Sequence, residues 1–139
     1  MAEQCFGGAK IALLHQEAIL VYLRDNRADI PWPGQWDLPG GGREGHETPL
    51  ACIQRETREE FGLTVLPQHI LWQRRYDGVL VGQPATWFMV GTLAPQQIAA
   101  IQFGEEGQYW RMMAIDVFIH HPHAISHLRQ RLADYMIMR

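Results

Sequence analysis

The chain has 139 residues, of which 47% are hydrophobic and 19% charged, and its formal net charge is −3 at pH 7. These values predict one globular domain, residues 1–139, and exclude a disordered chain. No apolar run approaches the ~18 residues that cross a bilayer, so no membrane partner is expected. The chain has no excess of basic residues for a nucleic-acid backbone, so we also expect no polymeric nucleic acid as partner.

The first ten residues, MAEQCFGGAK, lack the basic start and the apolar core of a secretory signal. The expected location is therefore cytoplasmic. Cys5 and Cys52 show neither a metal-binding spacing nor a disulfide framework. We expect plain thiols, buried or partly buried, at both positions.

Two apolar runs, residues 9–15 and 18–24, open the chain and are separated by Gln16 and Glu17. Their content of Ile, Leu, Val and Tyr predicts two strands joined by a tight turn. Later strand-like runs cover residues 70–76, 85–93 and 108–113. The second of these is apolar enough for a central strand. Residues 94–101 are ambiguous between a helical turn and a connection.

The segment of residues 25–37 contains two prolines and a glycine and predicts a loop. Trp32 and Trp36 within it have two open roles, because an indole either packs against apolar side chains or stacks on a nucleobase. Arg24 before the loop and Arg43 after it are placed to contact phosphate groups of a substrate. An ordinary surface cation is the alternative for each arginine.

The first predicted helix begins near Thr48, because Thr48 is a good N-cap and Pro49 suits the first helical position. It ends before Gly62, where a left-handed residue is needed. Residues 116–120 and 122–138 are also predicted to be helical, the latter from apolar residues at spacings of three and four. Strands on both sides of the first helix, with a terminal helix, predict an α/β fold, an α/β/α sandwich around a mixed β-sheet.

Three carboxylates, Glu56, Glu59 and Glu60, lie within five positions of the first helix and share one side of it. A separate stripe buries Leu50, Ile53, Thr57 and Phe61. Crowded like charges destabilise a helix unless a cation neutralises them, and a hard divalent cation prefers oxygen ligands. A solvated acidic face is the alternative. The glycine-rich loop at residues 39–42, whose backbone can approach a ligand closely, favours the cation.

The residues from 41 to 63 have a regular spacing of glycines and charges. In order they are Gly41, Glu47, Arg55, Glu56, Thr57, Glu59, Glu60, Gly62 and Leu63. This pattern resembles the signature of the Nudix hydrolases, G-x5-E-x7-R-E-U-x-E-E-x-G-U, where U is a bulky aliphatic residue. Only Thr57 departs from it, on the buried side of the helix. The lead-in G-x-W-x-L-P-G-G, which starts at Gly34, resembles the MutT-like members.

The resemblance implies the Nudix fold and hydrolysis of a diphosphate linkage in a nucleoside diphosphate derivative, with Mg²⁺, or Mn²⁺ in its place, as cofactor. It also implies that Glu56 and Glu60 bind the metal and that Glu59 contributes directly or through water. A backbone carbonyl of Gly40 or Gly41 would complete part of the coordination shell. Glu56 is the first choice as general base, a role that differs among family members.

The resemblance also assigns roles outside the three carboxylates. Arg55 is expected to orient them and to pair with Glu47 in a structural bridge, with a surface ion pair as the alternative. Family members often add a glutamate from a later loop. Here Glu105 or Glu106 would join the site when that loop closes, and two solvated loop acids are the alternative.

The short chain and the MutT-like lead-in imply a (deoxy)nucleoside triphosphate substrate, oxidised ones included. The alternative function is a catalytically inactive Nudix-like module that binds nucleotides or regulates a partner, which the retained carboxylates disfavour. An isoprenoid diphosphate isomerase of the same fold is disfavoured because neither cysteine is evidently placed for it. His123 and His127 lie four residues apart, but a surface cluster is expected there rather than a zinc site. A homodimer is left open.

Overall fold

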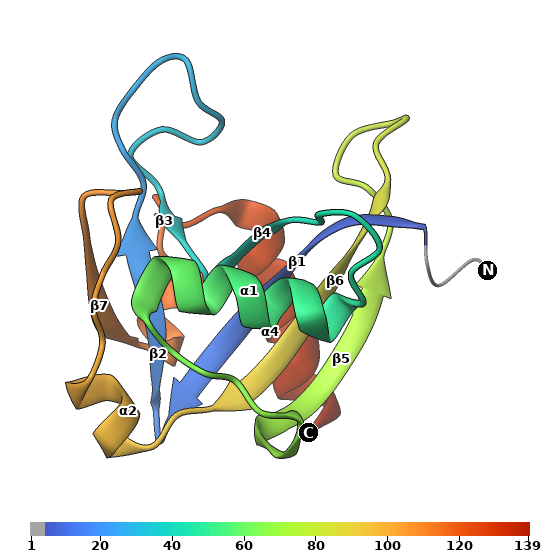
Figure 1. Ribbon diagram of the computed structural model, residues 1–139. Helices are drawn as coiled ribbons and strands as arrows, with labels where there is room; N and C mark the ends of the chain where they lie inside the picture. Colours follow the sequence, from blue (N-terminus) through green and yellow to red (C-terminus); the bar gives the residue numbers. More distant parts are fainter. Residues whose placement is uncertain (1–4) are drawn as a thin grey trace.

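The computed structural model describes residues 5–139, and a mixed β-sheet runs through its centre (Figure 1). The strands are β1 (Phe6–His15), β2 (Ala18–Leu23), β3 (Trp36–Asp37), β4 (Gly40–Gly42), β5 (Ile70–Tyr76), β6 (Ala85–Thr92) and β7 (Tyr109–Ala114). Their order is β3-β2-β1-β6-β5, with β4 paired to β1 and β7 paired to β2. β1 and β6 are parallel, whereas the other pairs are antiparallel, so the expected mixed sheet is confirmed.

Helices cover both faces of the sheet. They are α1 (Pro49–Phe61), the 3-10 turn η2 (Pro67–His69), α2 (Pro95–Ala99), α3 (Ile115–His120) and α4 (Ser126–Met138). In Figure 1, α1 crosses the front of the sheet and α4 lies behind it. Alternating residues of β1 serve the two layers, because Ile11 and Leu13 pack on the α1 side and Ala12 and Leu14 on the side of α3 and α4. The expected α/β/α sandwich is confirmed.

The ends of α1 lie where the sequence predicts them. The Thr48 hydroxyl accepts a hydrogen bond from the amide three residues on, at 3.1 Å. Gly62 has a left-handed conformation with φ of 67°, and its amide donates to the Arg58 carbonyl at 3.0 Å. Thr57 is fully buried, and its hydroxyl donates to the Ile53 carbonyl at 2.8 Å. The one departure from the family pattern therefore leaves no unpaired hydroxyl in the core.

One helix is shorter than predicted. The helix expected over residues 122–138 begins at Ser126, because the residues before it bond to β3 instead. The Trp36 amide donates to the His123 carbonyl (2.8 Å), and the Ile125 amide donates to the Trp36 carbonyl (3.1 Å). The ambiguous segment after β6 contains α2, a short helix. The other predicted strands and helices are present and differ only at their ends.

The glycines of β4 lie directly against β1. Gly40, Gly41 and Gly42 pair with Lys10, Ala9 and Gly8, respectively. At Gly40 the φ angle is 130°, and a Cβ there would overlap the Ala9 carbonyl oxygen, so only glycine fits. β4 also packs against α1, so the backbone of its glycines contacts both β1 and the helix. Within residues 5–139, no helix has the length and apolar character to cross a membrane.

Candidate active site

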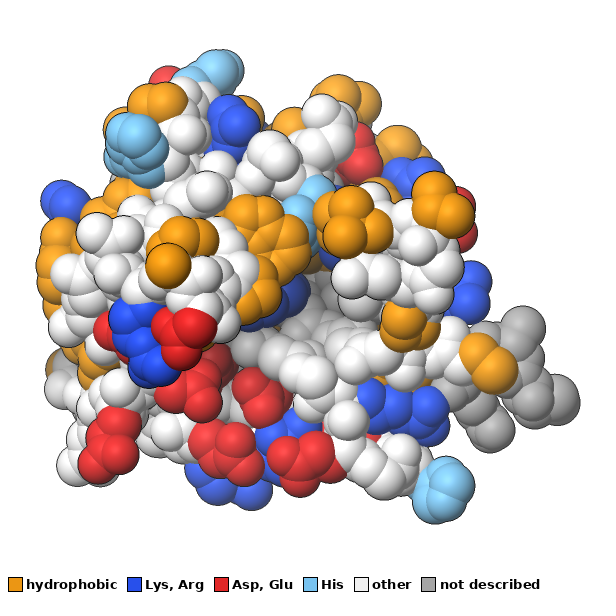
Figure 2. Space-filling model, turned by 90° about the horizontal axis from the view of Figure 1, so that it is seen from above, with side chains coloured by type: hydrophobic (Ala, Val, Ile, Leu, Met, Phe, Trp, Pro, Cys, Tyr) orange, Lys and Arg blue, Asp and Glu red, His pale blue; other side chains and the backbone are white. Residues whose placement is uncertain are grey.

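Five glutamates line one pocket beside the C-terminal half of α1, which we call the acid pocket. Its lining consists of Glu56, Glu59, Glu60, Gly104, Glu105 and Glu106, and its volume is about 350 Å³. The loop that carries the last three residues connects α2 to β7, and its Gly104 amide donates to the Glu60 carbonyl at 2.8 Å. Figure 2 shows acidic side chains gathered beside the central hollow of the molecule. The structure thus places both loop candidates next to the acids of α1.

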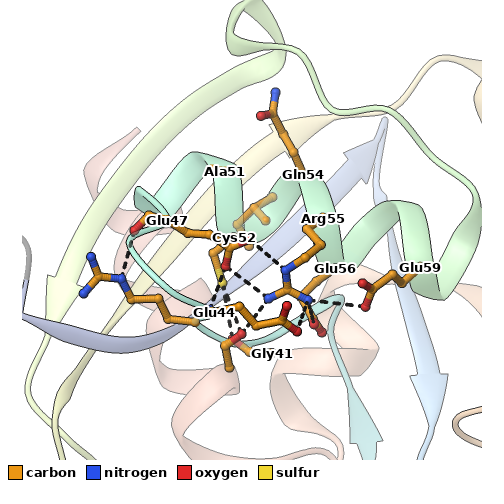
Figure 3. Close-up of polar contacts among 12 residues, drawn as sticks. Gly41, Glu44, Glu47, Ala51, Cys52, Gln54, Arg55, Glu56 and Glu59 are labelled. Carbon is orange, nitrogen blue, oxygen red and sulfur yellow. Dashed lines mark hydrogen bonds and ion pairs between the residues drawn. The ribbon is translucent and has the colours of Figure 1, made fainter.

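Arg55 connects the glycine loop to these acids (Figure 3). Its guanidinium makes two bonds to Glu47, from Nε to Oε2 at 2.7 Å and from Nη2 to Oε1 at 3.2 Å. Nη1 donates to Glu56 at 2.6 Å and to Glu59 at 3.3 Å, and Nη2 donates to the Gly42 carbonyl at 2.7 Å. The hydrogen bond from Arg55 lowers the pKa of Glu47. Because a bidentate pair fixes the plane of the guanidinium, Arg55 holds the Glu56 carboxylate in one orientation.

Two glycines of β4 receive carboxylates of α1. A Cβ at Gly41 would overlap the Glu56 carboxylate, so the missing side chain lets the acid reach the backbone. The Gly40 amide donates to Glu60 Oε1 at 2.9 Å. Burial raises the pKa of Glu60 to about 8, and nearby acidic charges add to the increase against the opposing effect of Lys10. Glu60 is therefore a partly buried acid whose charged form an added positive charge would stabilise.

The acids of α1 share the pocket, but each is turned to a partner within the protein. Glu56 faces Arg55, and Glu60 faces the Gly40 amide. Within residues 5–139, no three acidic, histidine or cysteine side chains stand together as a metal-ligand set. The ligand set of Glu56, Glu59 and Glu60 stays a prediction.

The donor atoms nevertheless fit the metal that the family resemblance implies. Carboxylate and carbonyl oxygens are the ligands that Mg²⁺ and Mn²⁺ prefer. The pocket offers carboxylates, and the neighbouring strand β4 offers backbone carbonyls. The Gly40 carbonyl accepts a hydrogen bond from Lys10 Nζ at 3.2 Å, while the Gly41 carbonyl lies 3.6 Å from Cys52 Sγ. The partly buried Glu60, whose pKa is raised, adds a carboxylate that a cation would stabilise.

A buried ion cluster, which the sequence analysis missed, lies next to the glycine strand. Oδ2 of Asp37, a side chain only 1% exposed, lies 3.1 Å from Lys10 Nζ, 2.9 Å from Arg24 Nη1 and 3.0 Å from the Tyr22 hydroxyl. Burial alone would raise the pKa of Asp37, but Lys10, a backbone amide and Arg24 outweigh it and lower the pKa. Two cations and one carboxylate leave one net positive charge. The signal in the sequence was Lys10, the only lysine or arginine of the apolar run 9–15.

A second pocket, which we call the aromatic pocket, lies on the other side of β4 and has a volume of about 310 Å³. The lining residues of interest are Lys10, Trp32, Gly41, Val79, His127 and Arg131. It lies between two loops, residues 25–35 and 77–84, which project upward in Figure 1 and flank the hollow in Figure 2. Trp32 is 39% exposed, and its ring centroid lies 5.2 Å from that of His127. Because Gly41 lines this pocket and touches Glu56, the two pockets meet at β4.

The two tryptophans of the loop have different surroundings. Trp36 is only 6% exposed, and its ring packs against Tyr109 and His121. Of the two open roles of Trp36, the structure supports core packing. The expected role of Trp36 in substrate binding is therefore corrected. Trp32 keeps that assignment as a prediction.

The two arginine candidates also differ. Arg24 donates to Asp37 and to the Pro31 carbonyl, each at 2.9 Å, and it lines a pocket of about 300 Å³ that shares Glu106 with the acid pocket. Arg43 lines neither the acid pocket nor the aromatic pocket. Its guanidinium lies 4.3 Å from the Phe6 ring centroid, beside a pocket of about 440 Å³ at the start of α1. The phosphate contact expected from Arg43 is therefore not supported by its position.

The model of the NUDIX domain family matches residues 8–134 of the chain. The chain is 37% identical over 76 residues to an RNA pyrophosphohydrolase from Halorhodospira halophila. The aligned segment covers 45% of this chain and 42% of that protein. An RNA pyrophosphohydrolase from Xanthomonas oryzae pv. oryzae is 31% identical over 97 residues, covering 58% of this chain and 44% of that protein. The chain thus spans less than half the length of these two relatives.

Solved structures share the fold. The MutT protein from Methanosarcina mazei Go1 has a TM-score of 0.75 at 18% identity, covering 98% of this chain and 96% of that one. A NUDIX hydrolase from Nitrosomonas europaea has a TM-score of 0.74 at 22% identity, covering 95% of this chain and 70% of that one. These identities show the fold alone. The match of the family model over most of the chain shows that the protein belongs to the NUDIX domain family.

Proposed function

We propose that this protein is a pyrophosphohydrolase that uses Mg²⁺, or Mn²⁺, to cleave a diphosphate linkage in a nucleoside diphosphate derivative, with a (deoxy)nucleoside triphosphate as the first candidate. The observation that carries the proposal is the acid pocket, in which five glutamates from α1 and from the loop 104–107 line one space of about 350 Å³. An inactive module has no reason to keep so many acids together, because crowded like charges destabilise a folded chain.

The position of β4 between the two pockets supports a nucleotide as substrate. With the base in the aromatic pocket, the phosphates cross the bare backbone of the glycines toward the acid pocket. Lys10 lines the aromatic pocket, and its Nζ lies 3.2 Å from the Gly40 carbonyl. Its positive charge therefore lies beside β4, where the phosphates would pass. This arrangement gives the phosphates a local positive charge before they reach the glutamates.

Cleavage requires that the phosphate charge is screened, that a water molecule is activated and that the leaving oxygen is stabilised. A divalent cation supplies these functions when it is bound. Glu56, Glu59 and Glu60 would hold it, together with a carbonyl of β4. Arg55 keeps the Glu56 carboxylate oriented, which makes Glu56 the first candidate to accept the proton of the attacking water.

The loop 104–107 supplies the remaining acids. Glu105 and Glu106 are exposed and face the acids of α1 across the pocket. Gly107 next to them has a positive φ of 90°, a conformation that glycine adopts without strain. In this proposal one of the two glutamates approaches the phosphates when the loop closes on the substrate.

The names of the relatives favour a second candidate substrate, an RNA that carries a diphosphate linkage. The two curated relatives described above are both RNA pyrophosphohydrolases. Their names weaken the exclusion of polymeric nucleic acid that the net charge suggested, because recognition of one terminal nucleotide needs only a few local cations. The net charge of −3 still gives no broad basic surface, so single nucleotides stay the first candidate.

The test is to incubate the protein with Mg²⁺ or Mn²⁺ and a substrate panel. The panel contains nucleoside and deoxynucleoside triphosphates, ADP-ribose, NADH, coenzyme A, dinucleoside polyphosphates and a short RNA with a 5′-triphosphate, and released phosphate or pyrophosphate is measured. We expect turnover of at least one compound and its loss when the metal is chelated. Binding of nucleotides without turnover of any compound would contradict the proposal and support an inactive module.

A further inference from the structure

Arg131 of α4 carries a charge in the interior of the protein. The residue is only 5% exposed, yet it lines the aromatic pocket. Its Nη1 donates to the Thr86 hydroxyl at 2.9 Å, and its guanidinium lies 4.5 Å from the ring centroid of Tyr76. Neither partner is charged at neutral pH, since burial raises the pKa of Tyr76 to about 12. The groups in direct contact with the Arg131 guanidinium are therefore neutral, and the charge of Asp134 acts on it only from a longer distance.

No carboxylate forms an ion pair with this guanidinium. Within residues 5–139, none lies within the 4.0 Å of such a pair. Asp134, one turn further along α4, instead accepts from the Tyr76 hydroxyl at 2.8 Å and from the Gln130 amide at 3.1 Å. Burial lowers the pKa of Arg131, because the charged form loses hydration. An acceptor group of a ligand in the pocket would offset that loss.

The walls of the pocket suit a flat ring. The Trp32 and His127 rings lie together on one side, with centroids 5.2 Å apart. Val79 and Pro84 supply apolar surface from the opposite loop. Burial lowers the pKa of His127 to about 4, so its ring is neutral at pH 7 and packs as an aromatic group. A planar base would therefore meet apolar walls and one buried cation.

We propose that Arg131 selects the base of the substrate and that this base is guanine. The inference rests on the proposed function, because it takes the aromatic pocket as the nucleoside site. Two N–H groups of a guanidinium match two acceptors on one edge of a ring, and O6 and N7 of guanine present that pair. Adenine places its N6 donor beside N7, and uracil places its N3 donor between its two carbonyl oxygens, so neither base offers two adjacent acceptors. Cytosine has such a pair in N3 and O2, but O2 stands next to the sugar, so that edge is harder to turn toward a group deep in the pocket. The same arginine therefore disfavours adenine and uracil most, and CMP is the strongest competitor of GMP.

The test measures binding of GMP, AMP, CMP and UMP to the whole protein by calorimetry in the presence of EDTA, so that neither metal nor turnover contributes. We expect GMP to bind at least ~10-fold more tightly than AMP, the range of one bidentate contact to a base. Arg131→Lys keeps the charge but loses the paired donors, so the ratio should fall below ~3-fold while thermal unfolding stays close to that of the original protein. Equal binding of GMP and AMP by the original protein overturns the inference, as does an unchanged ratio in Arg131→Lys.

Trp32→Ala is the matched control in the same pocket. Stacking tolerates every base, so this variant should weaken GMP and AMP by similar factors and keep their ratio. Turnover of the four nucleoside triphosphates separates this inference from the proposed function. Hydrolysis without a preference for GTP would contradict the role of Arg131 but not the proposed activity. A preference for GMP without any hydrolysis would contradict the proposed activity but not the role of Arg131. If Arg131→Lys does not fold, the ratio of GMP to AMP affinity in the original protein tests the inference.

Discussion

The acid pocket and the aromatic pocket lie on opposite sides of β4, but the chain builds them differently. Three of the five glutamates of the acid pocket fall within five consecutive positions of α1. The aromatic pocket instead combines side chains from β1, from the loops 25–35 and 77–84, and from α4. Most of the groups proposed for chemistry are therefore local in the sequence, apart from Glu105, Glu106 and β4, whereas those proposed for recognition meet only after folding. Substitutions that separate turnover from nucleotide binding test this division.

The largest expected effect is on turnover, in Glu56→Gln. Glutamine keeps the size of the side chain but removes the negative charge that a cation or a proton requires, so kcat/KM should fall by at least ~100-fold. Binding of GMP without metal should change by less than ~3-fold, since Glu56 does not line the aromatic pocket. Both quantities are measured on the purified variant, by phosphate release and by calorimetry.

Glu44→Gln is the matched control for that variant. Glu44 also contacts Arg55 Nη1, at 3.2 Å, but it is exposed and does not line the acid pocket. Its turnover should stay within ~3-fold of the original protein, because an exposed ion pair contributes little. Full activity of Glu56→Gln, or an equal loss in both variants, would remove Glu56 from the chemistry.

A smaller loss is expected where the two pockets meet, in Gly41→Ala. The new Cβ would overlap the Glu56 carboxylate and displace it, and a shift of about 1 Å at a reacting group reduces turnover by up to ~100-fold. Gly42→Ala is the comparison, because the nearest atom to its new Cβ is the Gly7 carbonyl oxygen at 3.9 Å. Steady-state kinetics of the two variants measure the difference. Equal losses would show that β4 tolerates no side chain at all, rather than that Gly41 admits Glu56.

The same division explains what could be predicted from the sequence. The helix of the acid pocket, its Thr48 cap and its left-handed Gly62 depend on neighbours within a few residues, and the structure has each of them. Trp32 and Trp36 lie in the same loop-like segment of the sequence, so the sequence does not show which ring is buried. Trp36 is buried because β7 and the segment before α4 pack against it. The helix predicted from residue 122 is shortened by the same contacts with β3.

Lys10 and Arg131 show why recognition groups were harder to predict. Each stands in an otherwise ordinary strand or helix, and its partners are 27 and 45 residues away, at Asp37 and Thr86. No spacing within one element marks such a pair. A lone lysine in an apolar strand was the one visible signal, and it identifies an unusual position without identifying its partner.

The two tryptophans separate binding from stability. Trp32→Ala should raise KM by ~10-fold with little change in kcat, because it removes stacking surface from the proposed base site. Trp36→Ala should instead lower the free energy of unfolding by about 3 to 5 kcal/mol, the usual range for a buried tryptophan. Kinetics and thermal unfolding of both variants test the contrast. A raised KM in a stably folded Trp36→Ala would restore Trp36 to the binding site.

The smallest expected effect is on stability, in Asp37→Asn, which acts on the ion cluster beside β4. At neutral pH the variant leaves Lys10 and Arg24 without their shared carboxylate, so the free energy of unfolding should fall by about 2 kcal/mol. The pKa of Asp37 is lower in the folded protein than in the unfolded chain, so its charge stabilises the fold above the unfolded value of about 3.9. That contribution is lost as the pH falls through the lower folded pKa.

Thermal unfolding of Asp37→Asn and the original protein, followed from pH 8 to pH 3, should therefore give curves that differ at neutral pH and approach each other in acid. Asp29→Asn is the control, because the Asp29 and Arg27 side chains of that ion pair are both exposed and the pair should contribute little at any pH. A constant difference between the Asp37→Asn and original curves at all pH values would mean that the carboxylate acts through its shape and hydrogen bonds. In that case the charge of Asp37 would not stabilise Lys10 and Arg24 beside β4.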